Sequence, residues 1–439
     1  MFGTSGIRGP VGETVTAGVA LSVGRALGAE TDRVVIGRDP RESGETLLDA
    51  LSSGLRELGA DVIDLGIAAT PTIARGVDWY DADAGVAVTA SHNPPEDNGL
   101  KLWQRSGQAY DSAGQERITE RIEADEYDLC AWDELGSRKS VDAAGRHVNA
   151  LAEAAAESGA LNLDVAVDLG NGAGSVSVEA LIKAGARVET LNAQPDGRFP
   201  GRPSEPTSEN CAALSTLVET GAYDLGIAHD GDADRMRAVA GDGTYLSGDA
   251  LLALFAADAS SSGDRVAVPV DTSLAVEDFL ADRGVGVVRT PVGDVHVAEA
   301  ATAPDVAFGG EPSGAWIWPD ETLCPDGPLA AIHIASMAAE EPLERRVRDI
   351  PAYPIRRSSI ETAEKSTVME RVESRVAESY ESVETLDGVR VSTDDGWFLI
   401  RASGTQPLVR LTAEARAEAA ADALLVEARE LVEAALAER

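Results

Sequence analysis

Short apolar runs that alternate with amphipathic stretches recur along most of this chain. In the first set, RVVIGRD at 33–39 and DVIDLG at 61–66 flank a helical pattern at 45–60, and GVAVTASHN at 85–93 runs into a polar loop. Strand–helix–strand units of this length indicate parallel pairing, because a crossover helix returns the chain to the same edge of the sheet. The alternation therefore predicts an α/β layer architecture.

The pattern restarts twice. An alanine-rich helix near 146–158 precedes the second set, and a helix near 248–258 precedes the third. The remaining strand-like and helical runs lie at 163–170, 176–184, 186–191 and 223–230, and at 264–271, 273–283, 284–294 and 305–314. Each unit spans roughly a hundred residues, the usual size of a domain. We infer three related α/β domains, at 1–145, 146–247 and 248–349.

The last part of the chain differs from the rest. Strand-like runs at 350–360 and 388–415 are separated by turns, and helical patterns near 364–380 and 416–437 flank them. This order predicts a smaller α+β domain at 350–439.

Acidic residues dominate the charge of the chain. It has 75 acidic and 37 basic residues, a net charge of −38, and lysine occurs only at positions 101, 139, 183 and 365. Such a surface repels nucleic acid and anionic membranes, so we expect neither as a partner. It resembles the surface of proteins adapted to high salt, where screening reduces self-repulsion. Neither a signal-peptide pattern nor a run of eighteen apolar residues occurs, so we expect a cytoplasmic protein.

The segment VAVTASHNPPEDNGLKLW at 86–103 carries the first candidate site. A strand ends at Ala90 and places Ser91 on a loop broken by two prolines, where a serine becomes a nucleophile if a neighbour activates it. His92 is adjacent, and Lys101 follows in a chain that otherwise uses arginine, which indicates a need for a tunable ammonium. The alternative is a polar turn with a solvated serine.

The segment LGIAHDGDADRMRAV at 225–239 carries the second candidate site. Asp230, Asp232 and Asp234 follow a hydrophobic strand at every second position, so three carboxylates can converge on a divalent cation such as Mg²⁺. An EF-hand is excluded, because its sixth and twelfth loop positions hold Arg235 and Gly241. An aspartyl-phosphate enzyme with Asp230 as nucleophile and a solvated acidic loop remain alternatives.

Two further segments place polar groups beside glycines. FGGEPSGAWIW at 308–318 offers Glu311 and Ser313 to sugar hydroxyls, although many glycine-rich turns share this pattern. LIRASGTQPLVR at 399–410 surrounds Gly404 with guanidiniums and hydroxyls, a set typical of a phosphate site. These donors are Arg401, Ser403, Thr405 and Arg410. A solvated hairpin is the alternative interpretation of this last segment.

One segment resembles a dinucleotide-binding unit. DVAVDLGNGAGSVSVEALIKAGARVETL at 164–191 predicts a strand, a glycine-rich loop, a helix and a strand. Gly170, Gly172 and Gly174 do not match the G-x-G-x-x-G spacing, and a plain strand–helix turn explains them equally well. A nicotinamide dehydrogenase is therefore disfavoured.

Five segments in order resemble the α-D-phosphohexomutase family, from residue 2 to residue 410. They are FGTSGIRG, TASHNP with a downstream lysine, DGDADR, GEPSG and RASGTQP. The resemblance implies three related α/β domains with mixed sheets and a smaller C-terminal α+β domain. These four domains would surround a central cleft, and each would contribute one loop to it.

The resemblance also implies roles for the loop residues. The catalytic group comprises Ser91, which carries the phosphate, together with His92, Lys101 and Arg8, with His92 or Lys101 as general base. The ligands of Mg²⁺ are phosphorylated Ser91, Asp230, Asp232 and Asp234. The substrate-binding group comprises Arg235, Glu311, Ser313, Arg401, Ser403, Gly404, Thr405 and Arg410.

The implied reaction interconverts a hexose 6-phosphate and a hexose 1-phosphate. Phosphorylated Ser91 donates its phosphoryl group, a 1,6-bisphosphate turns over in the cleft, and its other phosphate returns to Ser91. A hexose 1,6-bisphosphate then serves as activator, the partner is a small phosphosugar, and the protein is a monomer or a homodimer. A non-catalytic phosphosugar-binding protein is the alternative.

Three positions depart from patterns frequent in the family. Ala315 follows GEPSG where histidine is common, and Gln406 replaces an acidic residue. Asp294 lies in TPVGDVHVAEA where the phosphomannomutase branch tends to carry histidine. The V-G-D form and the GGEPSGAW loop resemble the phosphoglucosamine mutase branch. We therefore favour glucosamine phosphate as substrate, with mannose or glucose phosphate as the alternative.

Overall fold

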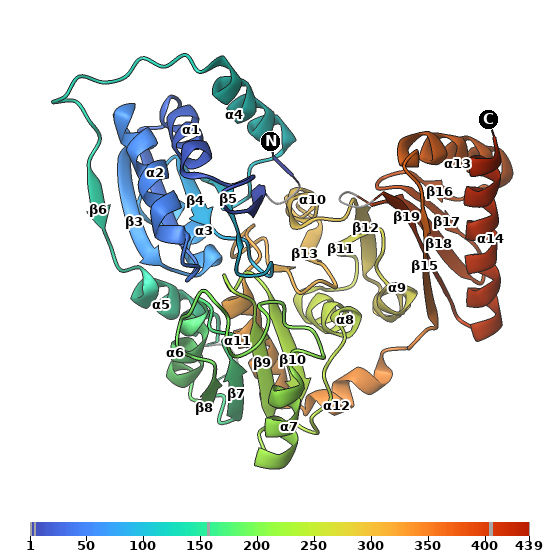
Figure 1. Cartoon of the computed structure of the whole chain (residues 1–439). Helices are drawn as coiled ribbons and strands as arrows, with labels where there is room; N and C mark the ends of the chain where they lie inside the picture. Colours follow the sequence, from blue (N-terminus) through green and yellow to red (C-terminus); the bar gives the residue numbers. More distant parts are fainter. Residues whose placement is uncertain (1, 4–5, 156–158, 404–406, 439) are drawn as a thin grey trace.

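Four β-sheets, formed in succession along the chain, organise the structure (Figure 1). The computed structural model describes residues 2–3, 6–155, 159–403 and 407–438. Three sheets are mixed and covered by helices, and the fourth is antiparallel with its helices on one face. The predicted combination of three α/β units and a smaller α+β unit is confirmed.

The first sheet has six strands in the order β1-β5-β4-β2-β3-β6. Its strands are β1 Ile7–Pro10, β2 Arg33–Arg38, β3 Asp61–Ile67, β4 Ala84–Val88, β5 Asp97–Gln104 and β6 Arg138–Ser140. The helices around it are α1 Ala17–Gly28, α2 Gly44–Glu57, α3 Thr70–Trp79 and α4 Ser112–Ala124. β2, β3, β4 and β6 run parallel, whereas β5 turns back antiparallel between β4 and β1. That reversal places Lys101 opposite Ala87, on the strand that leads to Ser91.

The second and third sheets share one topology. In each, the first strand lies between the second and third, which run parallel to it, and a fourth strand pairs antiparallel with the third. The second sheet comprises β7 Asp164–Asp168, β8 Arg187–Leu191, β9 Leu225–His229 and β10 Met236–Ala240. The third comprises β11 Arg265–Pro269, β12 Gly286–Thr290, β13 Val306–Gly310 and β14 Trp316–Ile317. The shared order supports the inference that these units are related.

In the described part of the chain, eight helices lie between β6 and the fourth sheet in sequence, and one of them packs the second and third units together. They are α5 Ala144–Ala154, α6 Ser175–Lys183, α7 Ala212–Gly221, α8 Gly248–Ala259, α9 Leu274–Ala281, α10 Asp294–Ala300, α11 Gly327–Glu340 and α12 Leu343–Arg346, followed by the 3₁₀ turn Val347–Asp349. α11 follows the third sheet in sequence but packs against α5, α6 and the strands of the second sheet. One hydrophobic cluster consequently runs through both units. The predicted domain limits stay a prediction.

The fourth sheet is antiparallel, in the order β15-β19-β18-β17-β16. Its strands are β15 Ile355–Glu361, β16 Val383–Glu384, β17 Val389–Ser392, β18 Gly396–Ala402 and β19 Leu408–Ala415. The helices α13 Lys365–Ser379 and α14 Glu418–Ala437 cover one face with valine, leucine and alanine. On the other face, Trp397 and Leu399 of β18 pack against Val270 of the third unit. The last domain is therefore docked on the third through the open face of its sheet.

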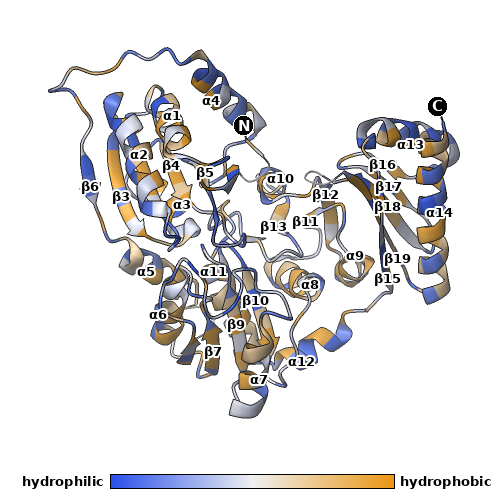
Figure 2. Ribbon diagram, viewed as in Figure 1, coloured by the Kyte–Doolittle hydropathy of each residue, from blue (hydrophilic) through white to orange (hydrophobic). Residues whose placement is uncertain are grey.

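Hydropathy follows this layering (Figure 2). Hydrophobic residues lie on the strands and on the inner faces of the helices, and hydrophilic residues lie on the outer faces. Among the described residues, no helix combines the length and the apolar character that a membrane span requires.

Candidate active site

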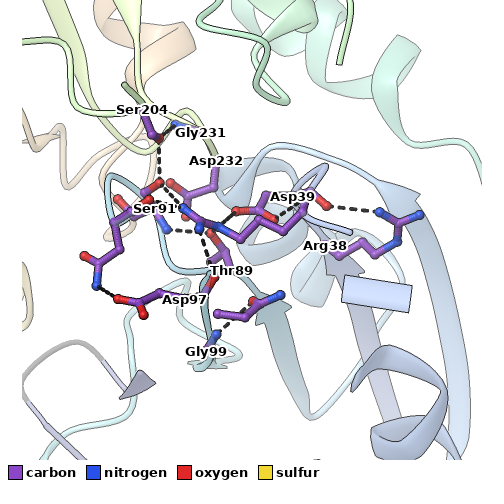
Figure 3. A network of polar contacts seen from close by, with 12 residues as sticks. Arg38, Asp39, Thr89, Ser91, Asp97, Gly99, Ser204, Gly231 and Asp232 are labelled. Atoms are coloured by element: carbon purple, nitrogen blue, oxygen red, sulfur yellow. Dashed lines mark hydrogen bonds and ion pairs between the residues drawn. The ribbon is translucent and has the colours of Figure 1, made fainter. Parts of the chain in front are cut away.

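Ser91 lies just after β4, with both of its backbone polar groups held. Its N–H donates to Thr89 Oγ1 at 2.8 Å, and its carbonyl accepts from Ser204 Oγ at 2.8 Å (Figure 3). Its φ of +52° is left-handed, a conformation that costs a non-glycine residue about 1 to 3 kcal/mol. Ser91 is only 1% exposed. The predicted nucleophile is thus buried and strained.

Three carboxylates of the loop after β9 converge on this serine. Ser91 Oγ donates to Asp230 Oδ2 at 2.5 Å and lies 3.5 Å from Asp234 Oδ1. One oxygen from each of Asp230, Asp232 and Asp234 lies within 4.8 Å of the others, and all three residues are buried. The second loop predicted from the sequence therefore meets the first.

The charges of these carboxylates fit a cation. Burial and repulsion from Asp234 raise the pKa of Asp230 and of Asp232. Burial also acts to raise the pKa of Asp234, but Lys101 and Arg235 lower it well below its usual range. Asp232 Oδ1 is buried without a hydrogen-bond partner among the described residues. A divalent metal ion would neutralise the three carboxylates and use this oxygen as a ligand.

Lys101 reaches the carboxylates from β5. Its Nζ donates to Asp234 Oδ2 at 2.6 Å and lies 3.7 Å from Asp294 Oδ2. Burial acts to lower the pKa of Lys101, but the attraction of Asp234 and Asp294 raises it above the usual value. Lys101 is therefore held as an ammonium, which suits charge neutralisation better than proton abstraction.

His92 is the other predicted base. Its Nδ1 lies 3.3 Å from Ser91 Oγ. Burial, followed by the positive charges of Arg235 and Arg8, lowers its pKa to about 3. The imidazole is therefore neutral at ordinary pH and keeps a nitrogen that can accept a proton.

Arg8 and Arg235 complete the charged surroundings of the serine. Arg8, on β1, donates from Nη1 to Asn93 Oδ1 at 3.4 Å, within the serine loop. The backbone N–H of Arg235 donates to Asp230 Oδ1 at 3.2 Å, and its guanidinium is attracted by Asp234 and Asp230. Both predicted arginines therefore lie around the carboxylate group.

Glu311 follows β13 and is held by its neighbours. Its Oε1 accepts from the Gly293 N–H at 2.7 Å, and its Oε2 accepts from Ser313 Oγ at 3.1 Å. Burial, with a smaller contribution from Asp294, raises the pKa of Glu311 to about 7. The loop joins the metal loop through a bridge between Ala315 and Arg235. The position where histidine is common thus serves as a backbone contact, and Ala315 is buried.

The fourth predicted loop lies at the ends of β18 and β19. Arg401 and Arg410 are directly opposed across these strands, so both side chains lie on one face of the sheet. Arg401 Nη1 donates to Asp387 Oδ2 at 2.7 Å, and the Ser403 N–H donates to the Leu408 carbonyl at 2.9 Å. Gly404, Thr405 and Gln406 lie outside the described residues.

A short loop before α10 connects the third and fourth candidate sites. The Val292 N–H donates to Asp387 Oδ2 at 3.3 Å, and the next N–H, from Gly293, donates to Glu311. Gly293 has a φ of +133°, a region that favours glycine. Among the described residues, no hydrogen bond or ion pair joins the fourth loop to Ser91.

Several residues at the site were not predicted from the sequence. Thr70, at the start of α3, donates from Oγ1 to Asp232 Oδ2 at 2.6 Å. Ser204 Oγ links the two central loops, since it also accepts from the Gly231 N–H at 3.0 Å. Asp39 and Arg41 lie beside Ser91 because parallel β2 and β4 end at the same edge of the sheet. The polar sequence RDPR at 38–41, where β2 ends, was a signal for this last pair.

Fold and site together have the features of a multidomain α/β enzyme of phosphoryl transfer. Four family models match in order: phosphoglucomutase/phosphomannomutase domains I, II and III at residues 1–128, 145–243 and 247–353, and the C-terminal domain at 359–431. The chain belongs to the phosphoglucomutase/phosphomannomutase family.

Relatives resemble the chain over nearly all of its length. A probable phosphoglucosamine mutase of Methanopyrus kandleri is 44% identical over 427 residues, which are 95% of this chain and 94% of the relative. A protein of the same description from Methanococcoides burtonii is 42% identical over 440 residues and covers 99% of both chains. The crystal structure of a phosphoglucomutase/phosphomannomutase family protein from Burkholderia thailandensis has a TM-score of 0.88 at 26% identity, covering 100% of this chain and 99% of that one.

Proposed function

We propose that this protein interconverts the 6-phosphate and the 1-phosphate of glucosamine through a phosphorylated Ser91. The contact between Ser91 Oγ and Asp230 Oδ2, inside a buried group of three carboxylates, carries the proposal. A serine in an ordinary polar turn would be exposed to solvent, whereas Ser91 is buried, has a left-handed backbone conformation and contacts a carboxylate. The relatives described as probable phosphoglucosamine mutases support the amino sugar over mannose or glucose phosphate.

The residues of the site divide the work of phosphoryl transfer. In the first half-reaction, the bond between phosphorus and Ser91 Oγ breaks and a bond from phosphorus to the free sugar hydroxyl forms. His92, neutral and beside Ser91, is placed to receive the proton of that hydroxyl. Lys101, Arg8 and Arg235 supply positive charge around the transferring group.

Asp230, Asp232, Asp234 and phosphorylated Ser91 would hold Mg²⁺. When bound, the ion would neutralise negative charge on the transferring phosphoryl group.

The remaining loops orient the sugar. Glu311 and Ser313 offer acceptor and donor groups to vicinal hydroxyls, and Arg401 offers a guanidinium to the phosphate that does not react. The bisphosphate formed in the first half-reaction must reverse its ends before the second, so either phosphate has to fit at Arg401. A hexose 1,6-bisphosphate restores phosphorylated Ser91 when it has been lost, and therefore acts as activator.

A coupled mutase assay with the 6-phosphates of glucosamine, mannose and glucose tests the proposal. It contains Mg²⁺, high salt and a trace of the matching bisphosphate. We expect turnover with a preference for glucosamine phosphate, and its loss in Ser91→Ala with the folded state retained. Turnover by Ser91→Ala at the wild-type rate would exclude the phosphoserine mechanism. A phosphoenzyme cleaved by hydroxylamine would indicate Asp230 instead, since an acyl phosphate is cleaved and a phosphoserine is not.

A further inference from the structure

We propose that Arg41 is a positioning residue for phosphoryl transfer, because it fixes the loop that presents Ser91. The inference rests on the proposed function and adds a residue outside the five loops that the sequence singled out. Arg41 lies after β2, fifty residues before Ser91, and it is fully buried.

The guanidinium of Arg41 spans the serine loop. Its Nη2 donates to the Ser91 carbonyl at 3.0 Å and to the Asn93 carbonyl at 2.7 Å. Its Nη1 donates to the carbonyls of Pro94 and Asp97, the latter at 2.9 Å. One side chain therefore donates to four backbone carbonyls between the nucleophile and the start of β5.

Asp39 connects Arg41 to the backbone N–H of Ser91 through Thr89. Its Oδ2 accepts from Arg41 Nε at 2.9 Å and from Thr89 Oγ1 at 2.8 Å. Thr89 Oγ1 in turn accepts the Ser91 N–H. The ion pair of Asp39 and Arg41 thus reaches both peptide groups of Ser91, and Figure 3 shows Asp39, Thr89 and Ser91 within this network.

The strain at Ser91 explains why such a hold is needed. A non-glycine residue at φ +52° relaxes unless its surroundings determine its conformation. Without the guanidinium, the Asn93 carbonyl would lose its donor, and the Ser91 and Pro94 carbonyls would keep only Ser204 Oγ and the Asp97 N–H, so the observed conformation would be held less firmly. Lysine cannot replace the guanidinium, because an ammonium has three donors around a point and lacks the planar fork.

Position matters here because Ser91 acts twice in each catalytic cycle. It gives up a phosphoryl group to one hydroxyl and receives one from the opposite end of the bisphosphate. A displacement of about 1 Å between reacting atoms lowers a rate by about 100-fold. Arg41 touches no substrate atom in this scheme, so its contribution falls on the transfer step and not on sugar binding.

The test compares Arg41→Lys with the wild type and with Arg56→Lys. Arg56 is a matched control in the same domain, because its Nε donates to the Gly136 carbonyl at 2.7 Å, in a loop without a candidate site residue. We expect Arg41→Lys to lower kcat by about 100-fold while KM changes by less than about threefold. Arg56→Lys is expected to keep the wild-type kcat.

A single-turnover measurement on the phosphorylated protein distinguishes misplacement of Ser91 from a general loss of structure. The phosphorylated protein is mixed with glucosamine 6-phosphate in a single turnover, and phosphoryl transfer to sugar is compared with release of inorganic phosphate to water. We expect Arg41→Lys to shift this partition toward water, because the serine loop no longer keeps a fixed geometry. Asp39→Asn, which retains the guanidinium, gives the same shift to a smaller extent and serves if Arg41→Lys does not fold.

The outcomes are distinct. A kcat within twofold of the wild type in both Arg41→Lys and Asp39→Asn, with an unchanged partition, would overturn the inference and leave the mutase proposal intact. A wild-type protein that turns over none of the three hexose phosphates would overturn both.

Discussion

The serine loop and the fourth-domain loop are built in opposite ways. Around Ser91, the nucleophile, the carboxylates and the supporting arginine are buried, and most of their polar atoms have partners within the protein. In the fourth domain, Arg410 is exposed, and Arg401 is half-buried and donates to the carboxylate of Asp387. The two regions differ in how much of their geometry exists before a ligand arrives.

The difference corresponds to what each region is proposed to do. Bond formation requires reacting atoms to be aligned closely, and that alignment is obtained by fixing the nucleophile in advance. A phosphate that does not react needs positive charge and donors, and it must be accepted from either end of the intermediate. A buried, preformed site suits the first task, and an accessible one suits the second.

The largest effect is expected at the carboxylate that receives the Ser91 hydrogen bond. Asp230→Asn removes a charge from the metal loop at nearly constant volume, and we expect kcat to fall by about 1,000-fold in the coupled assay. Asp305→Asn, which loses an exposed ion pair with Arg265, serves as the control and should retain activity. Equal activity in the two variants would show that the buried carboxylates do not act in the transfer.

Glu311 lies between the two regions and should make stability depend on pH. Its pKa is about 7 in the folded protein, against the usual 4.5, so between these values the folded state holds a proton that the unfolded state has lost. The free energy of unfolding should therefore fall as pH rises from 4.5 to 7, by about 3 kcal/mol from this group, and level off above pH 7.

Glu311→Gln tests this pH dependence, because the amide does not ionise. Urea unfolding at pH 5 and pH 8 should show a larger loss for the wild type than for Glu311→Gln. Glu299→Gln, at an exposed position of α10, should follow the wild type. The same pH dependence in all three proteins would show that groups other than Glu311 cause the fall in the free energy of unfolding.

At the fourth domain, we expect binding to change more than chemistry. Arg401→Gln removes a charged donor, and a hydrogen bond to a charged group contributes about 1.5 to 3 kcal/mol. KM for the hexose phosphate should therefore rise by roughly 10- to 100-fold, with kcat changed much less. A fall in kcat with KM unchanged would place Arg401 in the transfer step and remove the distinction between the regions.

The smallest effect is expected at Asp387. This carboxylate occupies Arg401 and competes with an incoming phosphate, so Asp387→Asn should lower KM by a few-fold, or about 1 kcal/mol. Asp394→Asn, in the exposed turn before β18, is the control. A higher KM in Asp387→Asn would mean that the carboxylate orients Arg401 for the phosphate and does not compete with it.

Much of the fold could be predicted from local pattern. Strands such as β2, β7 and β11 and helices such as α2 and α14 were predicted close to their observed limits, because periodicity and apolar runs are properties of neighbouring residues. The antiparallel turn of β5 and the packing of α11 on the second sheet were not predicted. Both depend on which surfaces remain to be covered once the other elements have assembled.

The sequence by itself determined which residues are candidates for chemistry here. Ser91, the three aspartates, Lys101 and Glu311 stand at strand ends or in short motifs, where residue type and spacing carry the information. Only the tertiary structure decided how they are held. Arg41, Ser204 and Thr70 reach their partners across 50, 113 and 162 residues of chain. Such contacts leave no local pattern, because chain folding and not sequence spacing brings their atoms within hydrogen-bond distance.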